Sequence, residues 1–275
     1  MNTQRLRPSI LVYVFLAIVA LVQLLPFWLA ITTSLKPTTD LSSVLLPPAG
    51  DVAWQNYADA VSRGNILTAI GNTALVTVIA TAGVCILGAM AAYPLARRRT
   101  RLNGLVAAGI LSLIMIPPLS ILVPLYTLLT EFGGINTYWA MIVVMIAQNL
   151  PLSIFLFTAF MRGIPESLDE AARLDGASSL QVFFRIVFPL LKPVTATVVI
   201  LASVAIWNDF AMSNYIMTDP SMQMIAPAVA KYFAQQSGNT GLGAANALIG
   251  VIPVLVAYLF LQRYFMKGMV AGSEK

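Results

Sequence analysis

Six segments of this sequence contain no charged residue, and this pattern constrains the fold more than any other feature. The segments are residues 8–35, 64–96, 102–130, 132–161, 193–208 and 232–262. A helix that crosses a bilayer needs about 20 mainly apolar residues, and five of the segments reach that length. The fifth in chain order is shorter, so its helix is expected to continue past Asp209. The predicted spans are 10–34, 68–96, 104–129, 138–161, 193–217 and 244–264.

The overall composition agrees with a membrane protein built only from helices. Charged residues make up 10% of the chain and hydrophobic residues 59%, whereas soluble domains carry about 25% charged residues. The apolar part of the first span, 10–31, is longer than the core of a signal peptide, so we expect an uncleaved anchor. The prediction is an all-α membrane protein with six transmembrane helices.

The distribution of Lys and Arg predicts the orientation of the chain. With the N-terminus inside, the inner segments carry 13 of the 16 basic residues, and the outer segments carry only Lys36, Arg63 and Lys231. Basic residues concentrate on the cytoplasmic side of membrane proteins. Both termini and the polar segment 163–191 are therefore predicted to be cytoplasmic. The net charge of +5 follows from this topology and does not indicate a nucleic-acid partner.

Missing residue types exclude several kinds of chemistry. The chain contains no His, and its single cysteine, Cys85, falls inside the second predicted span. Disulfides, thiolate or imidazole metal sites and Ser-His-Asp catalysis are thereby excluded within this chain. No Gly-Lys pair occurs, so there is no phosphate-binding loop. We expect no catalytic residue, no metal site and no cofactor here, and any ATP must be bound by another subunit.

The polar segment between the fourth and fifth spans predicts a helix followed by a glycine turn. Ser167 and Glu170 are spaced as a capping box that can start a helix. Gly176 can end that helix in the left-handed conformation.

A second helix is predicted directly after that turn. Ser178 and Gln181 repeat the capping-box spacing. One apolar face is expected from the helical spacing of Leu180, Phe183, Phe184 and Val187. From local physics alone the whole element could be an ordinary surface hairpin.

The same segment resembles the EAA motif of importer-type ABC permeases. Nine positions fit that pattern: Glu170, Ala171, Ala172, Asp175, Gly176, Ala177, Phe183, Ile186 and Pro189. Further stretches across nearly the whole chain are similar to carbohydrate-uptake permeases, including Asn72-Thr73, Tyr93-Pro94-Leu95-Ala96-Arg97 and Trp207-Asn208-Asp209. The chain looks like the smaller, six-span permease of the maltose-type importers.

The resemblance implies a type I ABC importer fold and a set of partners. Residues 1–65 would form a cytoplasmic tail, the first span and an external loop. Residues 66–265 would form the transmembrane domain with coupling loop 163–191, and 266–275 a cytoplasmic tail. The chain would be a non-catalytic half of the pathway in a bacterial or archaeal cytoplasmic (inner) membrane. Its partners would be a homologous permease, an ATPase dimer that binds ATP and Mg, an extracellular or periplasmic solute-binding protein, and membrane lipid.

The resemblance also assigns residues that would couple the permease to the ATPase: Glu170, Ala171, Ala172, Asp175 and Gly176. The two alanines are small enough for close approach to another surface. Glu170 could pair with a basic residue of the ATPase, or could serve only as half of the capping box. Both interpretations stay open.

Polar residues within the predicted spans are candidates for the translocation pathway, because such residues are costly in hydrocarbon. The candidates are Pro117, Ser120, Gln148, Asn149, Asn208 and Asp209. The alternative interpretation is hydrogen bonding between helices, or, for Asp209, contact with the outer interface.

The last external loop carries the candidate contacts with the solute-binding protein. They are Phe233, Gln235, Gln236 and Asn239, and their position is similar to that of a loop in maltose-type permeases that reaches into the binding protein. An ordinary mobile loop is the alternative.

Two other functions remain from composition alone. A self-contained secondary transporter or channel would leave the polar hairpin unexplained, and no acidic proton relay lies mid-membrane. A membrane anchor of a redox enzyme usually ligates haem through an axial ligand such as histidine, which this chain lacks.

Overall fold

A computed structural model describes residues 10–273 apart from 64, 99 and 236–238. The described residues form helices, turns and loops, and no strand occurs among them. They divide into two compact units. The first comprises Met1–Ile66 with Val229–Val251, and the second Leu67–Ala228 with Ile252–Lys275.

The first unit is built around one long helix and the loop that follows it. It contains α1 (Ile10–Ser34), α2 (Gln55–Arg63), most of α12 (Ile225–Gln235) and the beginning of α13 (Thr240–Ser273). Its small core consists of Ala60, Leu242 and Ala245. The side-chain amide of Asn56 donates to the carbonyls of Ser34 and Lys36 at 2.9 and 3.0 Å. This buried contact fixes α2 against the end of α1.

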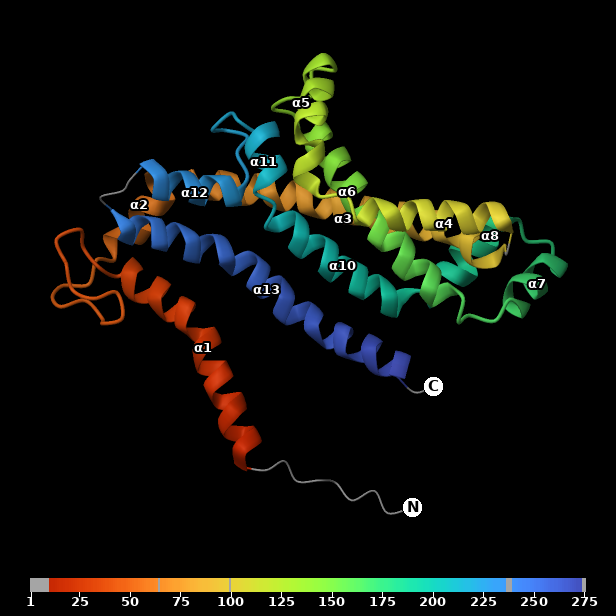
Figure 1. Cartoon of the computed structure of the whole chain (residues 1–275), viewed down its shortest axis with the longest axis horizontal. Helices are drawn as coiled ribbons and strands as arrows, with labels where there is room; N and C mark the ends of the chain where they lie inside the picture. The colour runs from red at the N-terminus through yellow and green to blue at the C-terminus, as the bar shows by residue number, and fades with distance from the viewer. Residues whose placement is uncertain (1–9, 64, 99, 236–238, 274–275) are drawn as a thin grey trace. The chain divides into compact units, whose positions relative to one another are not determined.

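The second unit contains the main hydrophobic core. It also contains the polar hairpin of residues 163–191, whose helices α7 and α8 are labelled in Figure 1. Its helices are α3 (Ile66–Arg97), α4 (Arg101–Ile114), α5 (Leu122–Glu131), α6 (Tyr138–Met161), α7 (Ser167–Leu174), α8 (Ser179–Val182), α9 (Phe188–Leu190), α10 (Lys192–Trp207) and α11 (Ala211–Ile216), with the remainder of α13. The core is formed mainly by the inward faces of α3, α6 and α10. Helix α6 contacts α4, α10 and α11.

Small side chains allow α3 to lie very close to α6. A Cβ atom added at Gly88 would collide with the hydroxyl of Ser153 and contact the ring of Phe157. Ala92 and Ala96, at the following four-residue steps, are buried. Close backbone approach of this kind stabilises helix pairs in membranes, where apolar burial alone gives little advantage over lipid.

Among the described residues, four helices are long and apolar enough to cross a membrane: α1, α3, α6 and residues 240–260 of α13. The number rises to six if each of two bent helix pairs forms one span. The predicted third span, 104–129, corresponds to one of these bent pairs, in which residues 101–114 and 118–131 meet at 94°. Pro117 adopts an extended conformation, as expected for a residue that precedes a proline. The prolines thus interrupt the helix.

The predicted continuation of the fifth span to 217 is also interrupted. Helix α10 ends at Trp207, and α11 begins at Ala211. The carboxylate of Asp209 accepts a hydrogen bond from the backbone N–H of Ser213 at 2.8 Å. Side chains that take backbone hydrogen bonds in this way favour helix starts over helix interiors. At its other end, α10 meets the segment Ser179–Leu190 at a 77° bend.

Candidate functional site

The polar hairpin begins with helix α7, whose start lies one residue earlier than the sequence predicts. Glu166 is the N-cap residue, and its carbonyl accepts from the N–H groups of Asp169 and Glu170. Ser167 is already helical, and no side-chain hydrogen bond caps this end. The predicted capping box of Ser167 and Glu170 is therefore wrong. Glu170 does not serve as a cap.

The end of α7 agrees with the prediction. Gly176 has a φ of +85°, in the left-handed region. Its N–H donates to the carbonyl of Arg173, and the N–H of Ala177 donates to the carbonyl of Ala172 at 2.9 Å. This pair of hydrogen bonds is the Schellman arrangement, in which a left-handed glycine closes the last turn. The chain therefore reverses sharply after α7.

The second capping box is also confirmed. The backbone N–H of Ser178 donates to the Gln181 side chain at 2.8 Å, and the Ser178 hydroxyl accepts from the N–H of Gln181 at 3.4 Å. These two bonds start α8 directly after the turn.

The apolar face predicted for the second helix is only half correct. Phe183 and Val187 are buried, whereas Leu180 and Phe184 are exposed. The helix is π-helical over Phe183–Val187. This wider turn shifts the face by one residue, so Val182 joins Val187 in the core. Periodicity of 3.6 residues could not reveal that shift.

An ion pair that the sequence did not reveal attaches α7 to the end of α3. The guanidinium of Arg97 donates to both carboxylate oxygens of Asp169, at 3.0 and 3.1 Å. Their side chains are 8% and 6% exposed. Arg97 also donates to the carbonyls of Met161 and Ile164 at 3.2 and 2.8 Å. One guanidinium thus joins α3, the end of α6 and α7, and bidentate pairs of this kind fix orientation as well as distance.

Tyr93 connects the same carboxylate to the second half of the hairpin. Its hydroxyl donates to Asp169 at 2.7 Å. Its ring lies 5.5 Å from the ring of Phe183, which also contacts the rings of Phe184 and Phe188. Tilted aromatic pairs at this distance are favourable. Both helices of the hairpin are therefore held against the Arg97 end of α3, as Figure 1 shows for the position of α7 and α8.

The opposite end of α3 carries a second polar attachment. The side-chain amide of Asn72 donates to the carbonyls of Ser221 and Gln223, both at 3.0 Å. Its oxygen accepts from the hydroxyl of Tyr138 at 2.7 Å. Asn72 thereby fixes the loop after α11 to α3 and α6. Helix α3 is thus hydrogen-bonded to a loop through Asn72 and to the hairpin through Arg97. These two residues lie about 37 Å apart along the helix axis at 1.5 Å per residue.

The surface that α7 presents is smaller and less alanine-rich than the motif suggests. Ala172 is buried against the protein itself, whereas Glu170 and Ala171 are exposed. Leu174 is 89% exposed, and Asp175 is exposed beside it. We call these four exposed residues the α7 surface. Leu174 was not singled out by its sequence position, where its only signal is an apolar residue in an otherwise polar turn.

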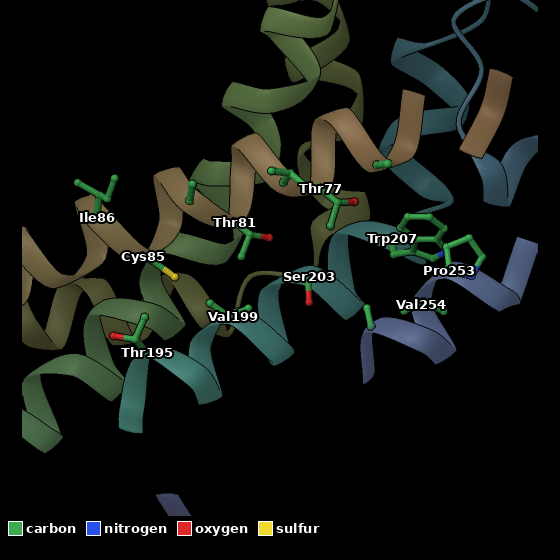
Figure 2. A pocket seen from close by; sticks show the side chains of 14 residues that line it. Thr77, Thr81, Cys85, Ile86, Thr195, Val199, Ser203, Trp207, Pro253 and Val254 are labelled. Atoms are coloured by element: carbon green, nitrogen blue, oxygen red, sulfur yellow. The ribbon is translucent and has the colours of Figure 1, made fainter. Parts of the chain in front are cut away.

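A cavity of about 460 Å³ opens between α3, α10 and α13 (Figure 2). Most of its lining is aliphatic, with Trp207 at one end. Thr77 and Thr81 are buried and line the cavity from α3, and their hydroxyls have no hydrogen-bond partner among the described residues. Thr195 and Ser203 add two further neutral hydroxyls to the lining. A few neutral hydroxyls in an apolar wall provide little of the convergent polar character by which a site orients a polar ligand.

Comparison with known proteins identifies the family. Residues 84–270 match the family described as binding-protein-dependent transport system inner membrane component, over more than half of the chain. The chain belongs to this family. It is a permease subunit of an ABC importer, and the secondary-transporter and redox-anchor interpretations are set aside.

Relatives cover the whole permease. It is 40% identical over 276 residues to the melibiose/raffinose/stachyose import permease protein MelC of Bacillus subtilis, with complete coverage of both chains. It is 33% identical to the trehalose transport system permease protein SugB of Mycobacterium tuberculosis, over 92% of each chain. A solved structure of a bacterial ABC transporter that imports the acidic polysaccharide alginate matches 93% of this chain and 95% of that one, with a TM-score of 0.77 and 23% identity. At that identity the match shows the fold alone.

The predicted pathway residues of the permease use most of their polar groups locally. Ser120 donates to the carbonyl of Pro117 at the α4–α5 bend. Asn149 and Asn208 each donate to the carbonyl four residues earlier, and Asp209 accepts from Ser213. No hydrogen bond joins any two of these candidates from different helices in the part of the chain that the structure describes. Their role in translocation stays a prediction.

Gln148 differs from the other pathway candidates. Its side-chain nitrogen is buried and has no hydrogen-bond partner among the described residues. A buried amide without a partner is costly, so Gln148 stays a predicted pathway residue.

Two of the four candidate contacts with the binding protein have local structural roles. Asn239 accepts a hydrogen bond from the N–H of Leu242 at 2.9 Å, which caps the start of α13. The ring of Phe233 lies against Gly243 and is 47% exposed. Gln236 lies outside the described residues, as does the side chain of Gln235.

Proposed function

We propose that this permease imports an uncharged oligosaccharide, as half of an ATP-driven translocation pathway. The main support is the 40% identity along the whole chain to a melibiose/raffinose/stachyose import permease. The charge pattern is also compatible, because no Lys or Arg occurs within residues 102–161 or 193–230. A pathway for strongly anionic solutes would be expected to include basic side chains, which act as selectivity groups for anions.

The α7 surface is the proposed contact with a separate ATPase subunit. The observation that carries this proposal is the Arg97–Asp169 pair, which holds α7 against α3 while Glu170 and Leu174 face outward. A helix that transmits force must be fixed to its own subunit and exposed to its partner. Glu170 would pair with a basic group of the ATPase, and Leu174 would be covered by it.

The α7 surface is proposed to face the cytoplasm, with both termini on the same side. The asymmetry of Lys and Arg supports this orientation. A homologous second permease would supply the other half of the pathway, and a solute-binding protein would deliver the sugar on the opposite side. ATP and Mg would be bound by the ATPase, whose closure would move α7 and, through Arg97, α3.

The direct test is reconstitution with the partner subunits encoded in the same genome. We expect raffinose, presented with the binding protein, to stimulate ATP hydrolysis and to enter proteoliposomes. The permease alone should show neither activity. Stimulation by acidic alginate oligosaccharides in place of raffinose would contradict the solute class and leave the ATP-driven mechanism intact. Uptake by the isolated permease would contradict the mechanism itself.

A further inference from the structure

The loop after α1 has a clear division between a polar inside and an apolar outside. Residues 41–50 contain no charged residue. Leu41, Val44, Leu45 and Leu46 are between 51% and 95% exposed. We call these four side chains the loop tip.

Hydrogen bonds place the loop tip beside the last turns of α1. The indole N–H of Trp28 donates to the carbonyl of Leu45 at 2.9 Å. The hydroxyl of Thr32 donates to the carbonyl of Val44. Trp28 lies six residues before the end of α1 at Ser34, or about 9 Å along the helix axis. The loop therefore folds back along α1 and reaches the level of its apolar turns.

Several polar groups of the loop are bonded to other groups of the same loop. The ammonium of Lys36, which is buried, donates to the carbonyls of Ser42 and Ser43 at 3.2 and 2.8 Å and to the Ser42 hydroxyl at 2.6 Å. The carboxylate of Asp40 accepts from the N–H groups of Ser42 and Ala49 at 2.8 and 3.0 Å. The N–H of Leu46 donates to the carbonyl of Ser43. Non-helical backbone is tolerated at membrane depth only where its polar groups are satisfied by protein.

We propose that the loop tip inserts into the interfacial and outer acyl region of the bilayer, where membrane lipid covers Leu41, Val44, Leu45 and Leu46. Three features support lipid as the occupant. The loop tip lies beside Trp28, and tryptophan is favoured at membrane interfaces. Residues 41–50 carry no charge, and the polar bonds of the loop point inward. The inference requires only that α1 spans the membrane. It does not depend on the solute or on ATPase coupling.

The test compares two labelled positions in the same loop. Leu45→Cys places a thiol at the loop tip. Gly50→Cys places one beside the charged Asp51, where an added Cβ meets nothing within 4 Å. The only natural thiol, Cys85, is buried. Each variant is labelled with an environment-sensitive fluorophore and studied in phosphatidylcholine nanodiscs, both as the full chain and in the assembled transporter.

Lipids with a spin label high on the acyl chain should quench the Leu45 label and shift its emission to the blue, while aqueous iodide should quench the Gly50 label. Leu46→Cys serves as a second loop-tip variant and should behave like Leu45→Cys. A Leu45 label that iodide quenches as strongly as the Gly50 label would overturn the proposal. So would a Gly50 label quenched by lipid as strongly as Leu45. A Leu45 label shielded from both quenchers, in the chain or only in the complex, would assign the surface to a protein partner and equally overturn lipid insertion.

Discussion

Arg97 at the end of α3 and Asp169 on α7 form a buried bidentate ion pair, with donor–acceptor distances of 3.0 and 3.1 Å. This pair determines which face of α7 is turned inward. Asp169 faces the protein, and its neighbour Glu170 faces outward. The proposed contact with the ATPase therefore depends on a residue that does not itself take part in that contact.

Breaking this ion pair should disconnect the hairpin from α3. Arg97→Gln leaves the buried carboxylate of Asp169 unpaired, and removal of one partner of a buried pair costs about 3–5 kcal/mol. We expect ATP hydrolysis to lose its dependence on sugar, measured as the ratio of stimulated to basal turnover in the assembled transporter. The neighbouring Arg98 is exposed, so Arg98→Gln is the matched control and should retain that ratio.

A double variant that exchanges the two charges distinguishes loss of the ion pair from general disruption of the structure. Arg97→Asp combined with Asp169→Arg should recover part of the stimulation lost in either single variant. Recovery should be incomplete, because the carbonyls of Met161 and Ile164 lose the donor that Arg97 provides. If the double variant is no better than the single variants, the pair is not the connection that matters.

Charge at Glu170 should affect coupling without affecting folding. Its side chain is exposed and has no partner among the described residues, and it does not cap α7. An exposed interface pair is worth up to about 1 kcal/mol, so Glu170→Gln should lower stimulated turnover by at most about fivefold. Glu170→Lys should lower it further by repulsion, and both effects should shrink at high salt. A Gln variant equal to wild type at low salt would remove Glu170 from the contact.

Which residues are tolerated at Gly176, in the turn after α7, should depend on the backbone conformation that they can adopt and not on the size of their side chains. A Cβ at Gly176 meets nothing within 4 Å, but its φ is +85°. The left-handed region costs most residues about 1–2 kcal/mol, and β-branched residues are especially disfavoured there. Gly176→Val should therefore lose uptake at normal membrane abundance. Gly176→Asn, which tolerates this region, should keep most of it, and equal loss in both variants would point to a different role for the glycine.

Asn72 should stabilise the far end of α3. Asn72→Ala removes the partner of two carbonyls and of the Tyr138 hydroxyl. Leaving such groups without partners costs about 1–3 kcal/mol. We expect a lower midpoint of thermal unfolding in detergent. Tyr138→Phe removes only one of these bonds and should lower the midpoint less; a larger loss in the Phe variant would contradict this ranking.

The loop after α1 should respond to acid through Asp40. Hydrogen bonds from the Ser42 hydroxyl and from the N–H groups of Ala49 and Ser42 lower the pKa of Asp40 from 3.8 to about 2. Because the folded pKa is depressed, the stabilisation is complete above pH 3.8 and is lost as the pH falls toward 2. Asp40→Asn should reproduce the loss at neutral pH. The measurement is the emission of a fluorophore at Leu45, which should stay unchanged between pH 7 and pH 5.

Local patterns in the sequence were sufficient to predict several helices and turns. Charge-free runs predict the helices α1, α3, α6 and α13, because only long apolar helices satisfy their backbone in lipid. Gly176 and the Ser178–Gln181 pair predict the turn and the start of α8, because caps depend on neighbouring residues alone. The family resemblance also rests on such local motifs, and the match over residues 84–270 confirms it.

Other features depend on residues that are far apart in the sequence. Asp169 and Glu170 are adjacent and chemically alike, and only the packing of α7 against α3 decides that one is buried and the other exposed. Arg97 lies 72 residues from Asp169, so no local spacing could connect them. The contact between the rings of Phe183 and Tyr93 likewise joins residues that are far apart in the sequence. The sequence by itself determined which segments are helical and which motif they carry, since these depend on short-range periodicity and capping. Only the tertiary structure decided which side of α7 is free, because that depends on the long-range bonds of Asp169 with Arg97 and Tyr93.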